Sequence, residues 1–187
     1  MPQRIIGFSG SLSSPSRTRA LVDLAVSRTA RRFGCTAATY EIADLQPSLG
    51  QAQSIAQLDS LSRMILDTIL SADALVVGTP VYKGSFTGLF KHMIDLIDPA
   101  ALAGKPVLLT ATGGGSRHAL VIEHQLRPLF GFFEAATLPT GVYAEPSDFH
   151  EGQPASDALL ARLDRAVDQF APWLGDASAT ATKSAAA

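Results

Sequence analysis

A segment rich in serine and glycine near the amino terminus contains the residue types that bind a phosphate group. Its hydroxyl and guanidinium donors are Ser9, Ser11, Ser16, Arg17 and Thr18. A loop of this composition that leads into a helix presents unpaired backbone N–H groups and the positive end of the helix dipole to an anion. Neither GxxxxGKS/T nor GxGxxG is present, so a terminal monophosphate fits better than a nucleoside triphosphate or a dinucleotide. The alternative is an ordinary serine-capped helix.

A second candidate segment, residues 79–88, follows a run of β-branched residues. Pro80 would stiffen the turn that leads away from the strand, next to Val81, and Tyr82 offers an aromatic wall with a polar tip. Lys83 could balance negative charge on a flat polar heterocycle, and the glycines let backbone amides approach such a ring closely. The alternative is a helix start with an exposed lysine.

A third candidate segment contains Thr112, Gly113 and Gly114, where bare backbone follows another apolar run. Glycine runs are common in loops, so the value of this one is its position. All three segments follow expected strands. Three loops whose composition suits ligand binding, each at the end of a strand, predict one shared binding site.

Other chemistries have little support in the sequence. The histidines and the single cysteine are scattered along the chain: His92, His118, His124, His150 and Cys35. No pair has metal-ligand spacing, so we expect no metal site. GxSxG and other nucleophile signatures are absent, which argues against hydrolysis. Hydride transfer remains, because it needs a cofactor and good positioning more than protein acids and bases.

The elements that would position these loops alternate between short apolar runs and longer stretches of helical period. The expected strands cover residues 4–8, 36–42, 74–78, 106–110 and 136–143. The expected helices cover residues 18–33, 58–69, 85–98, 113–130 and 159–174. This order is typical of an α/β fold with a parallel sheet covered on both faces. It could be wound as in flavodoxin or as a dinucleotide-binding half, and either places the ligand outside the carboxyl ends of the strands.

Composition narrows the class of protein further. The chain has 187 residues, of which 47% are hydrophobic and 17% charged, and its formal net charge is −2. We therefore expect one domain over residues 1–174, a mobile tail over 175–187, and no affinity for nucleic acid or a membrane. One cysteine and the lack of a signal peptide or spanning segment indicate a cytoplasmic protein.

Three stretches together resemble a known enzyme family over most of residues 4–130. They read IIGFSGSLSSPSRTRAL, ALVVGTPVYKGSFTGLFKHMIDLI and LLTATGGGSRHALVIEHQLRPLF. The sequence resembles the NAD(P)H-dependent FMN reductases that serve two-component alkanesulfonate and methanesulfonate monooxygenases. The resemblance implies a flavodoxin-like three-layer fold with a five-stranded parallel sheet in the order 2-1-3-4-5. It also implies dimers or tetramers and FMN at the strand ends.

The resemblance also assigns roles to the candidate residues. The donors of the first loop would hold the FMN phosphate: Ser9, Ser11, Ser16, Arg17 and Thr18. Two further groups would border the isoalloxazine ring, on one side Pro80, Val81, Tyr82 and Lys83, and on the other Thr112, Gly113 and Gly114. NADH or NADPH would reduce FMN, and the reduced flavin would pass to a partner monooxygenase. The alternatives are an FMN-bound quinone or azo reductase and an electron carrier, which the near-neutral charge disfavours.

His124 is the residue that the resemblance assigns a catalytic part. In this family the fourth helix carries one inserted residue that widens a turn into a π-bulge, and His124 aligns with it. Such bulges gather at functional sites, so we expect His124 to pack near the flavin across a subunit interface and keep FMN exchange fast. The alternative is a solvated or interface histidine on an ordinary α-helix.

Apolar residues of the third and fourth expected helices also predict an interface between copies of the chain. The aromatic ones are Phe86, Phe90, Phe130, Phe132 and Phe133. They exceed what one face of a sheet needs, and exposed apolar patches usually mark an interface.

Overall fold

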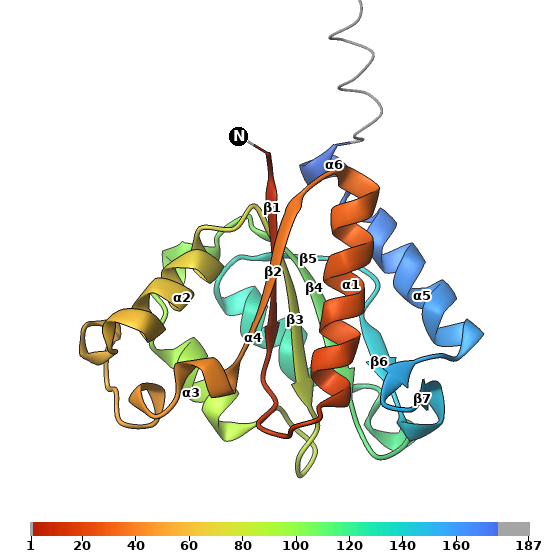
Figure 1. Cartoon of the computed structure of the whole chain (residues 1–187), viewed down its shortest axis with the longest axis horizontal. Helices are drawn as coiled ribbons and strands as arrows, with labels where there is room; N and C mark the ends of the chain where they lie inside the picture. The colour runs from red at the N-terminus through yellow and green to blue at the C-terminus, as the bar shows by residue number, and fades with distance from the viewer. Residues whose placement is uncertain (1, 176–187) are drawn as a thin grey trace, which may run out of the picture.

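The computed structural model describes residues 2–175, which form a parallel sheet between two layers of helices (Figure 1). The strands are β1 (Arg4–Ser9), β2 (Thr36–Glu41), β3 (Ala74–Pro80), β4 (Pro106–Thr112), β5 (Ala136–Thr137) and β6 (Val142–Ala144). Their order is β2-β1-β3-β4-β5, and β6 also pairs with β4. The expected flavodoxin-like α/β fold and strand order are therefore confirmed.

The helices divide between the two faces of the sheet. They are α1 (Arg17–Phe33), α2 (Ser60–Leu70), α3 (Gly88–Asp95), α4 (Arg127–Phe132), α5 (Asp157–Asp168) and α6 (Ala171–Leu174). One buried cluster joins α1 and α5 to the sheet, and the other joins α2, α3 and α4 to its opposite face. No helix within residues 2–175 is long and apolar enough to cross a membrane.

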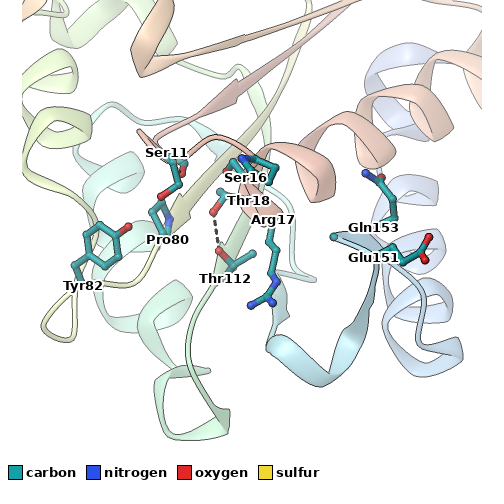
Figure 2. Close-up of a pocket in the computed structure, with 12 residues that line it drawn as sticks. Ser11, Ser16, Arg17, Thr18, Pro80, Tyr82, Thr112, Glu151 and Gln153 are labelled. Carbon is teal, nitrogen blue, oxygen red and sulfur yellow. Dashed lines mark hydrogen bonds between the residues drawn. The ribbon is translucent and has the colours of Figure 1, made fainter.

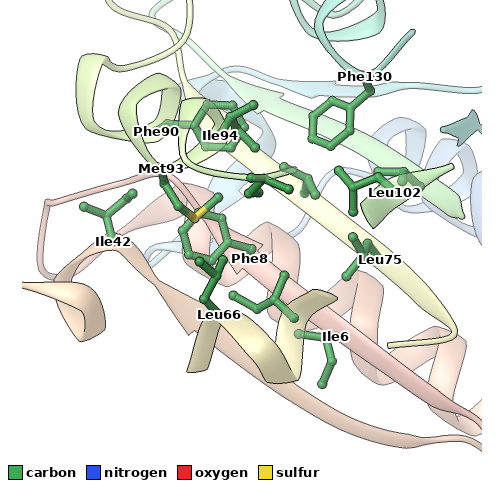
Figure 3. Packing of buried hydrophobic residues seen from close by; sticks show 14 of the residues in the cluster. Ile6, Phe8, Ile42, Leu66, Leu75, Phe90, Met93, Ile94, Leu102 and Phe130 are labelled. Atoms are coloured by element: carbon green, nitrogen blue, oxygen red, sulfur yellow. The ribbon is translucent and has the colours of Figure 1, made fainter. Parts of the chain in front are cut away.

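Successive side chains along each strand point to opposite faces of the sheet, so the strands contribute to both cores. In β1, Ile6 and Phe8 belong to the cluster under α2 and α3, which Figure 3 shows, whereas Ile5 faces α1. A Cβ added at Gly78 of β3 would lie 2.5 Å from a methyl group of Val22 on α1. Glycine there lets α1 pack closely on the sheet, which fixes the helix amino terminus beside the strand ends.

The fifth expected strand is divided into two short pieces. β5 pairs with the start of β4, and β6 pairs with its end, through Thr110↔Val142. Pro139 lies between the pieces and has no N–H to donate to a ladder. A Cβ at Gly141 would lie 2.5 Å from Ile122, so glycine lets the chain pass close to that side chain just before β6.

Several expected helices begin or end elsewhere. α3 begins at Gly88 because residues 82–85 form a hairpin. Residues 113–115 form a loop instead of opening the fourth helix, which begins after a 3₁₀ turn at Ser116–His118 with the π-helix η6 (Ile122–Leu126). The last expected helix is broken between α5 and α6, and Pro172 lies in the first turn of the second piece.

Two regions add elements that we did not expect. Three short 3₁₀ helices occupy the stretch between β2 and α2: Ile42–Leu45, Ser48–Gly50 and Ile55–Gln57. A small hairpin of β7 (Phe149–His150) and β8 (Gln153–Pro154) follows β6. The expected tail at 175–187 lies, except for Gly175, outside the described residues.

The expectation of an exposed phenylalanine surface is wrong for most of its members. Phe90, Phe130 and Phe133 are buried in the core under α3 and α4. Phe86 is partly buried against the same core, and only Phe132 of the five is largely exposed, at 70%. The rings fill the core between this face of the sheet and the short helices α3 and α4.

Candidate functional site

The three candidate loops meet in one cleft at the carboxyl ends of β1, β3 and β4. A cavity of about 540 Å³ opens there, within the usual size range of small-molecule sites (Figure 2). Its lining includes Ser11, Ser13, Pro15, Ser16, Arg17, Thr18, Pro80, Tyr82, Thr112, Glu151, Gly152 and Gln153. A smaller cavity of about 190 Å³ shares some of this lining and continues past Val81, Gly113 and Gly114. Together the two cavities form an elongated cleft.

The amino terminus of α1 forms the polar end of the cleft. Ser16 is its N-cap, and its hydroxyl accepts from the Arg19 N–H at 3.1 Å. Among the described residues, the N–H groups of Arg17 and Thr18 have no acceptor, as the first turn of a helix leaves them. These groups and the helix dipole make the electrostatic potential in the cavity favourable for an anion.

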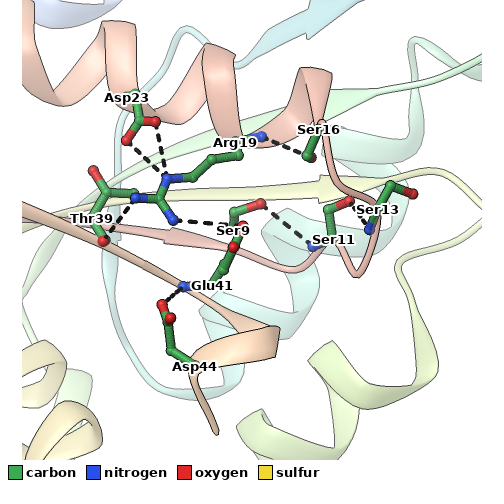
Figure 4. Close-up of polar contacts among 9 residues, drawn as sticks. All are labelled: Ser9, Ser11, Ser13, Ser16, Arg19, Asp23, Thr39, Glu41 and Asp44. Carbon is green, nitrogen blue, oxygen red and sulfur yellow. Dashed lines mark hydrogen bonds and ion pairs between the residues drawn. The ribbon is translucent and has the colours of Figure 1, made fainter. Parts of the chain in front are cut away.

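Serine hydroxyls shape the loop before this helix. Ser9 is fully buried, and its Oγ accepts from the Ser11 N–H at 3.4 Å (Figure 4). The Ser11 Oγ in turn accepts from the Ser13 N–H at 3.2 Å. Ser9 is not part of the cavity lining, so it supports the loop while Ser11, Ser13 and Ser16 line the cleft.

Two predicted residues from different loops bond to each other. The hydroxyls of Thr18 and Thr112 are 2.6 Å apart and buried. This bond joins the start of α1 to the end of β4, and both residues still line the cavity. It therefore fixes the width of the cleft between the polar end and the glycine loop.

Arg17 supplies the positive charge of the cleft. Its guanidinium carbon is 5.8 Å from the centroid of the Phe149 ring, a cation–π distance. Among the described residues it has no carboxylate partner. The ring thus supports the side chain while its five donors stay available to an anion.

The loop after β3 is a tight hairpin instead of a helix start. Tyr82 and Ser85 exchange both backbone hydrogen bonds, at 2.9 and 3.2 Å. Lys83 and Gly84 between them have φ of 53° and 83°, the positive values of a type I′ turn. Tyr82 lines both cavities, and Pro80 and Val81 lie beside it, whereas Lys83 is exposed at the tip outside the lining.

Tyr143 holds the glycine loop, and sequence reasoning missed it. Its hydroxyl donates to the Gly115 carbonyl at 2.6 Å, and burial is the main cause that raises the pKa of this phenol. A Cβ at Gly113 would collide with the same hydroxyl oxygen. Glycine is required there because the tyrosine crosses directly behind the loop.

The π-helix forms at the predicted place. The Arg127 N–H donates to the Ile122 carbonyl, five residues back, across the turn that contains His124. The His124 side chain is exposed, makes no hydrogen bond among the described residues and does not line the cleft of its own chain. Its neighbour Gln125 instead accepts from the Ser85 hydroxyl at 3.1 Å.

Glu123 and Arg127 brace the other side of the π-helix. Two hydrogen bonds of 2.6 and 3.0 Å join them, and Arg127 also donates to the Leu138 carbonyl at 3.0 Å. The hydrogen bonds from Arg127 are the main cause that lowers the pKa of Glu123. The wide turn is thus tied to the link between β5 and β6.

The hairpin of β7 and β8 forms a wall of the cleft that we did not predict. Glu151, Gly152 and Gln153 line the larger cavity. Glu151 and Gly152 have φ of 48° and 79°, again a two-residue hairpin turn. The Glu-Gly pair is a sequence signal for such a turn. It is weaker than Asn-Gly or Asp-Gly because glutamate rarely adopts positive φ.

The chemistry of this lining fits FMN. The larger cavity offers free N–H groups and serine hydroxyls, which together with Arg17 suit a terminal phosphate. The smaller cavity, which Arg17 and the Tyr82 ring also line, offers bare backbone, where a Cβ at Gly114 would meet nothing within 4 Å. A flat ring system can therefore approach the peptide planes closely.

Comparison with known proteins agrees with this fit. The family model described as NADPH-dependent FMN reductase matches residues 3–150. The FMN reductase (NADPH) of Pseudomonas aeruginosa is 44% identical over 177 residues, 95% of either chain. The NADH-dependent FMN reductase SfnF of Pseudomonas fluorescens is 44% identical over 174 residues, 93% of either chain.

Solved structures share the fold. An oxidoreductase from Corynebacterium diphtheriae superposes with a TM-score of 0.80 at 33% identity, over 92% of this chain and 97% of that one. An archaeal flavodoxin, at 13% identity and a TM-score of 0.62 over 92% and 99% of the two chains, shares the fold. The chain belongs to the NADPH-dependent FMN reductase family.

Proposed function

We propose that this protein uses NADH or NADPH to reduce FMN and supplies the reduced flavin to a partner monooxygenase. The observation that carries the proposal is the cleft itself. Free N–H groups and serine hydroxyls lie at the larger cavity, Gly113 and Gly114 line the smaller one, and Arg17 and Tyr82 line both. This arrangement suits a ligand with one anionic end and one flat end.

The first loop holds the FMN phosphate. Ser11 and Ser16 offer hydroxyls in the cavity wall, and the first turn of α1 offers the N–H groups of Arg17 and Thr18. Ser9 acts indirectly, since its hydroxyl fixes the Ser11 backbone. Charge-assisted hydrogen bonds are the strong ones, so the phosphate contributes much of the affinity.

The other two loops hold the isoalloxazine ring. Pro80, Val81 and Tyr82 form one wall, and the backbone at Gly113 and Gly114 forms the other. Lys83 follows Tyr82 at the exposed tip, from which a flexible side chain can reach the rim. FMN, when bound, supplies the two-electron acceptor that receives hydride from the nicotinamide nucleotide.

His124 acts across an interface between copies of the chain, in a homodimer or homotetramer. Leu120, which precedes the π-helix, is 62% exposed, and Phe132 is 70% exposed at the end of the helix that follows. Light scattering at micromolar concentration is expected to show more than one copy. His124→Ala is expected to slow FMN exchange, and a monomeric parent with unchanged exchange in the variant refutes this role.

The protein functions in the cytoplasm, a location compatible with a chain whose single cysteine, Cys35, forms no internal disulfide.

An acceptor comparison tests the proposed function. The protein is mixed with NADH or NADPH and then with free FMN or with a quinone. Turnover of free FMN supports the proposal. Turnover of the quinone alone indicates the FMN-bound reductase alternative, and no oxidation of either nucleotide indicates an electron carrier.

A further inference from the structure

The hairpin that presents Tyr82 to the cleft is anchored at its base, where Phe86 packs on Phe90 and the Thr87 hydroxyl donates to the Gly10 carbonyl, and has one side-chain hydrogen bond beyond it. At its base, the Val81 N–H donates to the Thr112 carbonyl at 2.8 Å, which continues the sheet. Beyond the base, residues 82–85 make a single side-chain hydrogen bond to another element in the described part of the chain. It joins the Ser85 hydroxyl to Gln125 Oε1 at 3.1 Å.

Neither local conformational preference nor packing holds the tip of this hairpin firmly in place. Lys83 has a positive φ of 53°, a conformation that lysine rarely adopts. The space around Gly84 is open, because a Cβ there would meet nothing within 4 Å. Tyr82 is 56% exposed, and Figure 2 shows its ring at the edge of the cleft. Packing alone therefore does not fix the ring.

The π-helix explains how Gln125 reaches the hairpin. Three consecutive residues, 123–125, are exposed between the buried side chains of Ile122 and Leu126. Glu123 at one side of this bulge is bonded to Arg127, and Gln125 at the other side is bonded to Ser85. An α-helical turn advances about 100° per residue, so one residue fewer would turn Gln125 away from Ser85.

We propose that Gln125 is a positioning residue that holds the 82–85 hairpin, and with it the Tyr82 ring, at the mouth of the flavin cleft. The link makes the π-helix a support for the binding site of its own chain. This inference rests on the proposed function for its effect on flavin, but the mechanical link between Gln125 and the hairpin is testable without any ligand.

Limited proteolysis tests the link in ligand-free full-length protein. Trypsin cleavage after Lys83 requires the hairpin to open, and under mild conditions its rate follows the population of the open form. Losing one exposed hydrogen bond is expected to raise this rate roughly fivefold in Gln125→Ala and in Ser85→Ala. The double variant is expected to match either single one, since both remove the same bond.

Steady-state kinetics test the effect on flavin. Gln125→Ala is expected to raise the KM for FMN roughly fivefold and to change kcat by less than about twofold, the pattern of lost binding without lost chemistry. Gln125→Glu keeps an acceptor oxygen for the Ser85 hydroxyl and is expected to restore the parent KM. A merely destabilised helix would not be rescued in this way.

Matched controls are available elsewhere on the surface. Gln51 and Ser27 are exposed, and their side chains make no hydrogen bond among the described residues. Gln51→Ala and Ser27→Ala are expected to behave as the parent in both assays.

Equal cleavage after Lys83 in Gln125→Ala and the parent overturns the proposal, as does an unchanged KM for FMN. If the parent itself fails to reduce FMN, the proposed function fails. Cleavage after Lys83 and direct titration with FMN then still decide whether Gln125 positions the hairpin.

Discussion

Replacing Gly113 with alanine directs a methyl group at the phenol of Tyr143. The new Cβ would collide with the hydroxyl oxygen and lie 3.1 Å from Cζ and 3.3 Å from Cε2 of the ring. Tyr143 cannot withdraw without losing its 2.6 Å hydrogen bond to the Gly115 carbonyl. The substitution therefore combines overpacking with the loss of a hydrogen bond.

The expected magnitude follows from these two effects. Overpacking costs about 1–3 kcal/mol and a lost hydrogen bond about 1 kcal/mol, so Gly113→Ala is expected to lower the free energy of unfolding by about 2–4 kcal/mol. Tyr143→Phe alone loses the hydrogen bond, at about 1 kcal/mol. The double variant removes the colliding oxygen, so its loss is expected to be about 2 kcal/mol smaller than the sum of the single losses.

Urea unfolding of the parent, both single variants and the double variant measures this coupling. Equal m-values are required before the free energies are compared. Strictly additive losses would refute the close packing of Tyr143 behind the glycine loop. A Gly113→Ala variant as stable as the parent would refute it as well.

Two further predictions concern the phosphate end and the π-helix. Arg17→Ala and Ser11→Ala are expected to weaken FMN far more than riboflavin, because riboflavin lacks the phosphate that these donors bind; equal losses in calorimetric titrations would remove that assignment. The hydrogen bonds from Arg127 hold the pKa of Glu123 below its ordinary value of about 4.5, so the ionised form stabilises the fold. This contribution is present above about pH 4.5 and is lost as the pH falls through the folded-state pKa; because the side chain is 44% exposed, it amounts to less than about 1 kcal/mol. The difference in unfolding free energy between the parent and Glu123→Gln should shrink on acidification, and a difference that does not vary with pH would contradict this.

The polar end of the cleft could be predicted because local signals determine it. Ser16 is a strong N-cap, and the apolar runs of β1, β3 and β4 are buried on both faces, which made the strand ends easy to locate. Once the strands are parallel, their carboxyl ends share one edge, so the three loops had to meet.

The features that were missed depend either on contacts between distant residues or on a locally disfavoured backbone conformation. Tyr143 resembles an ordinary strand residue until β6 places it behind Gly113. The hairpin at Lys83 and Gly84 places a lysine at positive φ, which local preference disfavours. Because of that turn, Lys83 lies outside the cavity lining. No pattern in residues 79–88 indicated the turn.

Anaerobic multiple turnover tests the central claim most directly. The full-length protein is mixed with NADH or NADPH and a large molar excess of free FMN, and the absorbance of oxidised flavin is followed. Loss of the absorbance of the whole FMN pool, with one nucleotide oxidised per flavin, is the predicted result. Oxidation that stops after one equivalent of nucleotide per protein, with the free FMN left oxidised, would contradict the account.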